Sequence, residues 1–177
     1  MAKKHPMPIR GMTSDGQAVT ISEVELGSLT QLAGWDNFDK LAGGILRKKS
    51  LSLPQDCRSS FRRGLTTVWR IAPDRVLVRS DTSMSFEAVG PLAALELSHS
   101  RVCVRLVGPG AASLLSRVIT IDLSEVGFPV GTFAQTAIHH VGVLVDRFGG
   151  DEFDVVIPTT FGVSLSGFLV EHLNRTR

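Results

Sequence analysis

The chain has 177 residues, 43% of them hydrophobic, and a formal net charge of only +2 at pH 7. This length and composition predict one ordinary domain with a hydrophobic core and no strong electrostatic field. The basic runs are short (Arg47–Lys49, Arg62–Arg63) and aromatic residues make up 6%. Nucleic-acid binding usually needs a concentrated basic face with stacking rings, so the composition argues against a nucleic-acid partner.

Cysteine usage and hydropathy indicate the compartment. Cys57 and Cys103 are isolated in the sequence, and two such thiols in a chain with a normal core are typical of reduced, cytoplasmic proteins. No apolar segment follows the charged start, and stretches such as Val141–Val145 are far shorter than the ~20 residues of a membrane span. We therefore expect a soluble, cytoplasmic protein without membrane contact.

The first 26 residues show little sign of regular structure, and a helical pattern follows them. Two prolines and two glycines interrupt residues 1–26, which indicates either a disordered tail or an arm that orders on a partner. Apolar residues then recur at helical spacing over Leu26–Leu46, predicting one or two helices. We expect this helical region to break near Gly34 and to end at Gly43-Gly44.

From residue 65 the pattern changes to strands. Leu65–Ile71 is rich in β-branched residues and is followed by a turn and by Val76–Val78, which predicts a hairpin. Another short strand is predicted at residues 93–97. Alternation over residues 101–106 predicts a strand whose valines and leucine share one face, while its two arginines share the other.

The last third predicts two helices and three or four strands. A helix with the apolar stripe Ala111, Leu114, Leu115 and Val118 follows a glycine-rich turn. Strands are expected at residues 132–138, 141–148 and 152–157, with a further one possible at 119–123 and with Gly149-Gly150 turning the last hairpin. Thr159 or Thr160 would cap the final helix, whose predicted core face is Phe161, Leu165, Phe168, Leu169 and Leu173. This order predicts an α+β fold with a largely antiparallel sheet and helices on one face.

No candidate site assembles an acid, a base and an orienting group. Gly108-Pro109-Gly110 lacks the third glycine of GxGxxG and any GK[ST], so it is interpreted as a strand-to-helix turn. His139 and His140 would point to opposite faces if they lay on a strand, which argues against a shared metal ion. The adjacent pair Ser98-His99 cannot by itself indicate a catalytic triad.

The carboxylates nearest to the predicted strand ends are Asp122 and Asp146, the latter followed by Arg147. Either could be catalytic, but surface ion pairing is the more common use of such residues.

Two segments resemble a known superfamily. Leu95–Ala111 (LELSHSRVCVRLVGPGA) is similar to a segment of the glycine-cleavage aminomethyltransferases, and the pattern continues through residues 131–137, 141–146 and 153–158. Within that superfamily, Trp69–Arg75 (WRIAPDR), Ile121–Leu123 with Phe128-Pro129 and Gly131, Ala134–Ala137 (AQTA), and Thr160-Phe161 with Ser164-Leu165 resemble the gamma subunits of heterotetrameric sarcosine oxidase. The resemblance covers roughly residues 62–174 and implies the fold of the first aminomethyltransferase domain.

The resemblance also implies what the chain does. The transferases carry a tandem Asp-Asp whose first carboxylate serves folate chemistry, and Val145 stands at the matching position here. A valine cannot accept a proton, so we expect no catalytic, cofactor-binding or metal-binding residues in this chain. The family implies alpha, beta and delta partner subunits that hold FAD, FMN, NAD, zinc and tetrahydrofolate, and that oxidatively demethylate sarcosine. The related N-methylglutamate dehydrogenases make another N-methyl amino acid possible.

The resemblance divides the chain into residues 1–60, an N-terminal arm with short helices, and residues 61–177, the aminomethyltransferase-like domain. Trp35, Phe38 and Trp69 are the predicted interface residues, because large aromatic side chains are typical anchors at protein contacts. Three alternatives stay open: a stand-alone folate-dependent transferase, a folate-sensing or iron–sulfur maintenance protein, and an unrelated interaction module. The maintenance proteins carry a cysteine motif that is not found around Cys57 or Cys103.

Overall fold

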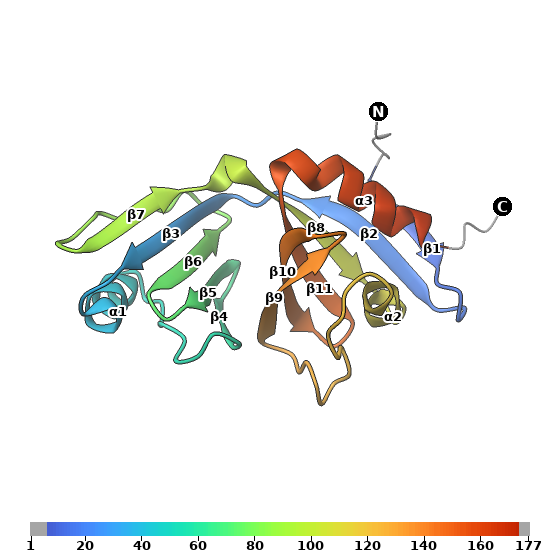
Figure 1. Ribbon diagram of the computed structural model, residues 1–177, viewed down its shortest axis with the longest axis horizontal. Helices are drawn as coiled ribbons and strands as arrows, with labels where there is room; N and C mark the ends of the chain where they lie inside the picture. Colours follow the sequence, from blue (N-terminus) through green and yellow to red (C-terminus); the bar gives the residue numbers. More distant parts are fainter. Residues whose placement is uncertain (1–6, 174–177) are drawn as a thin grey trace. The chain divides into compact units, whose positions relative to one another are not determined.

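The computed structural model describes residues 7–173, and within them the chain forms two compact units (Figure 1). One unit comprises the described residues of Met1–Glu25 and Ser100–Arg177, and the other is Leu26–His99. This division differs from the expected boundary between residues 60 and 61. The chain begins one sheet, leaves it after residue 25, builds the other unit, and returns at residue 100. The part of the expected arm before residue 7 lies outside the described residues.

The discontinuous unit is built on a six-stranded antiparallel sheet in the order β1-β2-β8-β11-β10-β9. Its strands are β1 (Ile9–Met12), β2 (Ala18–Val24), β8 (Arg101–Val107), β9 (Thr132–Ile138), β10 (Val141–Gly149) and β11 (Glu152–Pro158). Helices α2 (Ala111–Ser116) and α3 (Gly162–Glu171) contribute buried leucines to the core that forms against one face of this sheet. The predicted α+β fold with a largely antiparallel sheet is confirmed.

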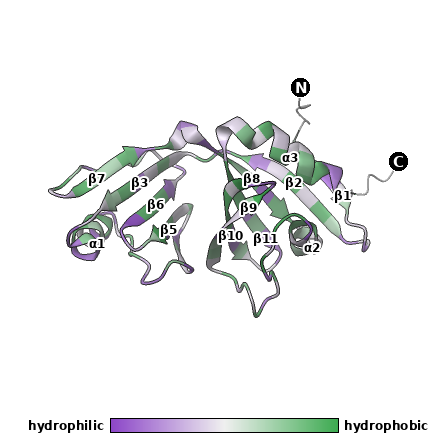
Figure 2. Ribbon diagram, viewed as in Figure 1, coloured by the Kyte–Doolittle hydropathy of each residue, from purple (hydrophilic) through white to green (hydrophobic). Residues whose placement is uncertain are grey.

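The continuous unit contains a second, five-stranded antiparallel sheet in the order β4-β5-β6-β3-β7. Its strands are β3 (Ser28–Gly34), β4 (Ser60–Arg63), β5 (Thr66–Ala72), β6 (Arg75–Ser80) and β7 (Leu92–Glu96). Helix α1 (Phe38–Lys48) buries Phe38, Ala42 and Leu46 in the core of this unit. Figure 2 shows both hydrophobic and hydrophilic residues along α1, as an amphipathic helix requires.

The prediction of an irregular N-terminal segment was wrong. Residues 9–12 and 18–24 form the hairpin β1–β2, and Gly16 supplies the positive φ of +79° in its turn. Val19 and Ile21 alternate along β2 and are buried in the core, while β2 pairs with β8. The glycines that interrupt the pattern therefore mark a turn between strands.

The helical prediction over Leu26–Leu46 was half wrong. Its first part is the strand β3, whose central position between β6 and β7 buries Leu29 and Leu32. The second part is α1, which runs through Gly43-Gly44 to Lys48. Leu29 and Leu32 lie on opposite faces of this central strand and are both buried, so the strict alternation that identifies strands is lost, and the two leucines stand three apart as in a helix.

Two smaller predictions near helix ends also fail. Residues 119–123 form no strand. A 3-10 turn, η2 (Thr159–Phe161), precedes α3, whose N-cap is Phe161, without a side-chain cap hydrogen bond. Leu165, Leu169 and Leu173 are buried as predicted, whereas Phe161 is 45% exposed.

Three hairpins confirm the predicted strands of the chain from residue 65 onward. Ala72 pairs with Arg75, so β5 and β6 turn on Pro73-Asp74, and β10 and β11 turn on Gly150-Asp151. Ile138 pairs with Val141, which leaves His139-His140 as a two-residue turn with φ of 47° and 67°. Positive φ at both central positions is the signature of a type I′ hairpin, whose twist matches that of the flanking strands.

Candidate functional site

A buried cluster of charged residues lies on the face of the six-stranded sheet that is turned away from its core. Arg105 on β8 stands directly opposite Asp154 on β11. Its Nε and Nη2 donate to Oδ1 and Oδ2 of Asp154 at 2.7 and 2.8 Å, a bidentate pair. The Asp154 side chain is fully buried, and hydrogen bonding to it raises the pKa of Arg105. The Phe148 ring lies 4.4 Å from the Arg105 guanidinium carbon.

Asp146 extends this cluster along the neighbouring strand. In the ladder between β10 and β11 it stands directly opposite Asp154, and both residues have no exposed surface. Residues opposite each other in an antiparallel pair have Cβ atoms about 5 Å apart. Two carboxyl groups and one guanidinium thus share one face, which we name the Asp146–Asp154–Arg105 cluster. Arg105 and Asp154 form the bidentate ion pair of this cluster, and Asp146 lies beside them on the neighbouring strand with no exposed surface.

Val145 points to the other face of the same strand. It is fully buried in the hydrophobic core of the discontinuous unit. Successive residues of a strand point to opposite faces, so Val145 and Asp146 cannot exchange roles without a shift of register. In this chain Val145 is a packing residue, and it brings no functional group to the face that carries Asp146.

Arg147 holds a loop in place instead of forming the surface ion pair considered for it. The residue is 3% exposed, and its Nη1 donates to the carbonyl oxygens of Phe128 and Leu123 at 2.9 and 3.3 Å. Its Nε donates to the carbonyl of Gly150 at 3.0 Å. These contacts tie the segment before β9, and the turn after β10, to the end of β10. Asp122 is an exposed turn residue, and its Oδ1 accepts the Ser124 N–H at 2.9 Å.

Gly108-Pro109-Gly110 is the predicted strand-to-helix turn, and the β1–β2 hairpin covers it. The Gly110 N–H donates to the Ala18 carbonyl at 3.0 Å. A Cβ built on Gly110 would come within 2.7 Å of the Gln17 carbonyl oxygen. The glycine is therefore required by the close approach of another backbone, and its N–H is already engaged within the protein.

Among residues 7–173, the histidines belong to no group that could hold a metal ion. His139 and His140 lie in the type I′ turn, and the His139 ring packs edge-on against Phe168 with centroids 4.0 Å apart. Within residues 7–173, no group of three His, Cys, Asp or Glu side chains is placed to hold a metal ion. His99 follows Ser98, whose hydroxyl donates to Glu96 and accepts the Leu29 N–H at 2.8 Å. The Ser98 hydroxyl is thus engaged by a carboxylate and not by the adjacent imidazole.

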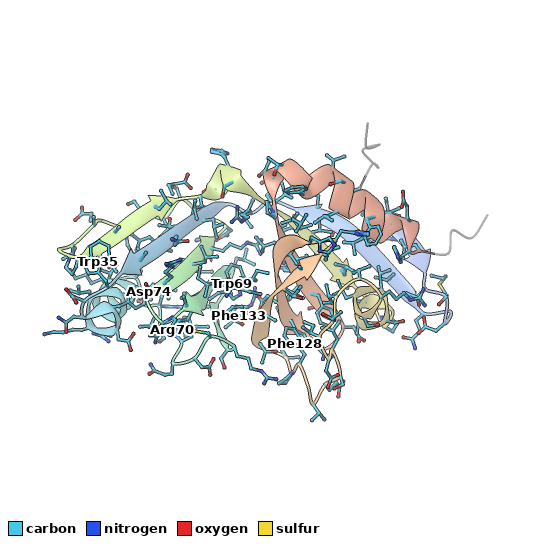
Figure 3. The ribbon with its side chains drawn as sticks, viewed as in Figure 1. Trp35, Trp69, Arg70, Asp74, Phe128 and Phe133 are labelled. Atoms are coloured by element: carbon cyan, nitrogen blue, oxygen red, sulfur yellow. The ribbon has the colours of Figure 1, made fainter. Side chains whose placement is uncertain are left out.

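The structure separates the three predicted interface residues. Trp35, at the end of β3, is 78% exposed (Figure 3). Phe38 is 6% exposed and belongs to the core under α1, and Trp69 has no exposed surface. Phe38 and Trp69 therefore present no accessible ring to a partner, and only Trp35 retains the exposure that this role requires.

A cavity in the continuous unit was not predicted from the sequence. It measures about 530 Å³ and lies beside β7. The residues that line it come from β3, from the segment after β6, and from β7 and its C-terminal turn: Gly27, Ser28, Thr30, Asp81, Ser83, Met84, Ser85, Phe86, Ala94, Glu96, Ser98 and His99. The Ser98 hydrogen bonds lower the pKa of Glu96. Ser83 and Ser85 alternate with Met84 and Phe86 over only four residues, which is too short a pattern to identify this wall from the sequence.

Hydropathy and helix length bear on the membrane prediction. Among the residues described, none of the helices combines the length and the apolar character that crossing a bilayer requires.

Comparisons with known proteins show similarity in structure alone. No protein family matches the sequence, and no curated protein matches it. A chain of heterotetrameric sarcosine oxidase from Corynebacterium sp. U-96, solved in complex with pyrrole 2-carboxylate, matches with a TM-score of 0.79 and 21% identity. The match covers 92% of this chain and 86% of that one.

A second solved structure is the glycine cleavage system aminomethyltransferase T from Bartonella henselae. It matches with a TM-score of 0.54 and 16% identity over 85% of this chain, which spans 45% of the transferase. The chain therefore has a fold found both in heterotetrameric sarcosine oxidase and in part of an aminomethyltransferase, and this confirms the resemblance at the level of the fold.

Proposed function

We propose that this chain is a non-catalytic accessory subunit, of the gamma type, in a sarcosine oxidase-type flavoenzyme complex. The observation that carries the proposal is the match to a chain of heterotetrameric sarcosine oxidase at a TM-score of 0.79 over most of both chains. The proposed complex oxidatively demethylates sarcosine or a related N-methyl amino acid. Its alpha, beta and delta subunits would hold FAD, FMN, NAD, zinc and tetrahydrofolate.

The chain's own residues support an accessory role. The Ser98 hydroxyl donates to Glu96, the His139 ring packs against Phe168, and Asp122 accepts a backbone N–H in an exposed turn. Asp146 has no exposed surface. A general base must be within hydrogen-bond reach of a proton that it removes from a substrate, and the fully buried Asp146 is poorly placed for that task. Trp35 supplies the exposed aromatic ring that a docking subunit would use.

The test is a capture experiment with the full chain. A tagged chain returned to extract of its own source should retain larger polypeptides, and the retained fraction should show flavin absorbance. In parallel, the isolated chain is titrated with tetrahydrofolate. A chain that captures no flavin-containing partner but binds the folate and transfers a one-carbon group would overturn the proposal in favour of the stand-alone transferase. Substrate oxidation by the retained fraction, compared between sarcosine and N-methylglutamate, identifies the amine.

A further inference from the structure

The cavity beside β7 combines apolar and acidic walls. Met84 and Phe86 are half-buried and pack against the core of the continuous unit, so their outer surfaces form apolar walls. Asp81 and Glu96 contribute carboxylates, and no lysine or arginine occurs among the described residues that line the cavity. Glu96 accepts the Ser98 N–H at 2.8 Å, and the Ser98 hydrogen bonds keep the pKa of Glu96 low, so it is ionised at neutral pH.

The outer edge of β7 adjoins this cavity. The Leu97 N–H donates to the Leu29 carbonyl at 2.7 Å, and neighbouring residues of an antiparallel strand alternate in direction. The main-chain groups of Leu95 therefore point to β3, and those of Ala94 and Glu96 point away from it. Leu92, which also points away, exchanges hydrogen bonds with Val89. The outward main-chain groups thus belong to the same two residues whose side chains line the cavity.

This edge carries few of the features that protect sheet edges, and Glu96 is the one charged residue of β7. β7 (LAALE) has no lysine, proline or bulge, whereas β4 at the opposite edge of the sheet carries Arg62 and Arg63. Figure 2 shows β7 as predominantly hydrophobic, and Leu95 on its other face is 54% exposed. Unprotected, apolar edge strands readily pair with an added strand.

We propose that β7 is a docking edge for an extended segment of a partner chain, and that this segment places one lysine or arginine in the cavity. This inference rests on the proposed accessory role. Main-chain hydrogen bonds to Ala94 and Glu96 would add the segment as a further strand. The methylene stem of the basic residue would lie on Met84 and Phe86, with its charged end between Asp81 and Glu96. Two carboxylates in the cavity lining favour a cation over an anion, and the apolar side chains of Met84 and Phe86 favour a long stem. Residues on the other face of the added strand would cover Leu95.

Short peptides test the surface without knowledge of the partner. The probes are capped heptapeptides of alternating threonine and valine whose central residue is lysine, norleucine or glutamate, titrated into the full chain by fluorescence anisotropy. We expect the lysine peptide to bind at least tenfold more tightly than the norleucine peptide, and this preference to fall as salt rises. Glu96→Gln should abolish the preference, whereas Glu87→Gln, an acid outside the cavity lining, should leave it unchanged. Ala94→Pro should abolish binding of every peptide, since it removes an outward N–H.

An unfolding curve of each variant is the control, which should show that a loss of peptide binding does not come from a loss of the folded structure. Absence of peptide binding to the wild-type chain, or equal binding of the lysine and norleucine peptides, overturns the inference. Repeating the capture experiment with Glu96→Gln and Ala94→Pro tests the docking edge separately from the proposed function. Undiminished capture of flavin-containing partners refutes the docking edge and leaves the accessory role intact. Lysine-selective peptide binding without any captured flavin partner supports the edge and refutes that role.

Discussion

Replacing Arg105 by methionine tests whether the bidentate pair supports the discontinuous unit. The change keeps most of the side-chain volume, removes both hydrogen bonds to Asp154, and leaves the carboxyls of Asp154 and Asp146 on one face without the guanidinium. Breaking a buried ion pair by removing one partner costs about 3–5 kcal/mol. The Arg105 side chain is 29% exposed, so part of its charge is screened by water, and we expect about 2–3 kcal/mol.

The measurement is the free energy of unfolding from urea titration at pH 7. Arg75→Met is the control, because Arg75 lies 3.6 Å from Asp74 with both side chains about half exposed, and such surface pairs contribute less than about 1 kcal/mol. In the double variant Arg105→Met with Asp154→Leu, at least half of the lost stability should return, since the uncompensated acid is gone. A loss below about 1 kcal/mol for Arg105→Met, or no recovery in the double variant, would refute the role assigned to the pair.

Three further predictions concern the turns, the surface and the cavity. Gly110→Ala should lower the free energy of unfolding by more than about 1 kcal/mol, because the added Cβ would overlap a backbone carbonyl. Gly44→Ala, inside α1, has open space around the added Cβ and should raise the free energy of unfolding by about 0.5–1 kcal/mol. Urea titration of both variants checks this. Trp35→Ala should change the free energy of unfolding by less than about 0.5 kcal/mol while weakening assembly with the larger subunits, as measured by sedimentation; unchanged assembly with a destabilised chain would contradict it. Ser98→Ala should raise the pKa of Glu96 toward its ordinary value, as followed by carbon-13 NMR of the carboxyl group, because the serine hydrogen bonds are the cause of its low pKa. A carboxyl group whose pKa is lower in the folded state stabilises the protein above its unfolded-state pKa, and this stabilisation is lost as the pH falls through its folded-state pKa. The variant should therefore lose less stability than the wild-type chain between these two pKa values. An unchanged pKa of Glu96 would contradict the assignment.

The candidate site was only partly predictable from the sequence. The turn at Gly108–Gly110 agrees with what residue type and spacing indicate, whereas the exposure of Trp35 follows from neither. The burial of Trp69 does not follow from the sequence, because a tryptophan in a β-branched strand serves equally well on a packed or an exposed face. The cavity beside β7 joins segments separated by up to 72 positions, from Gly27 to His99, and no local pattern announces it.

The sequence by itself determined the elements whose contacts are local. Alternation identified β8, and turn residues identified the hairpins β5–β6 and β10–β11, because their partners are a few residues apart and the period of two appears in a short window. Only the tertiary structure decided the places of β2 and β3. β2 pairs with β8 across some eighty intervening residues, and β3 is central in its sheet, so that the stability of each comes from partners distant in the chain. The stabilisation from such pairing comes from burying side chains against strands that are remote in the sequence. The sequence of a single segment therefore does not reveal it.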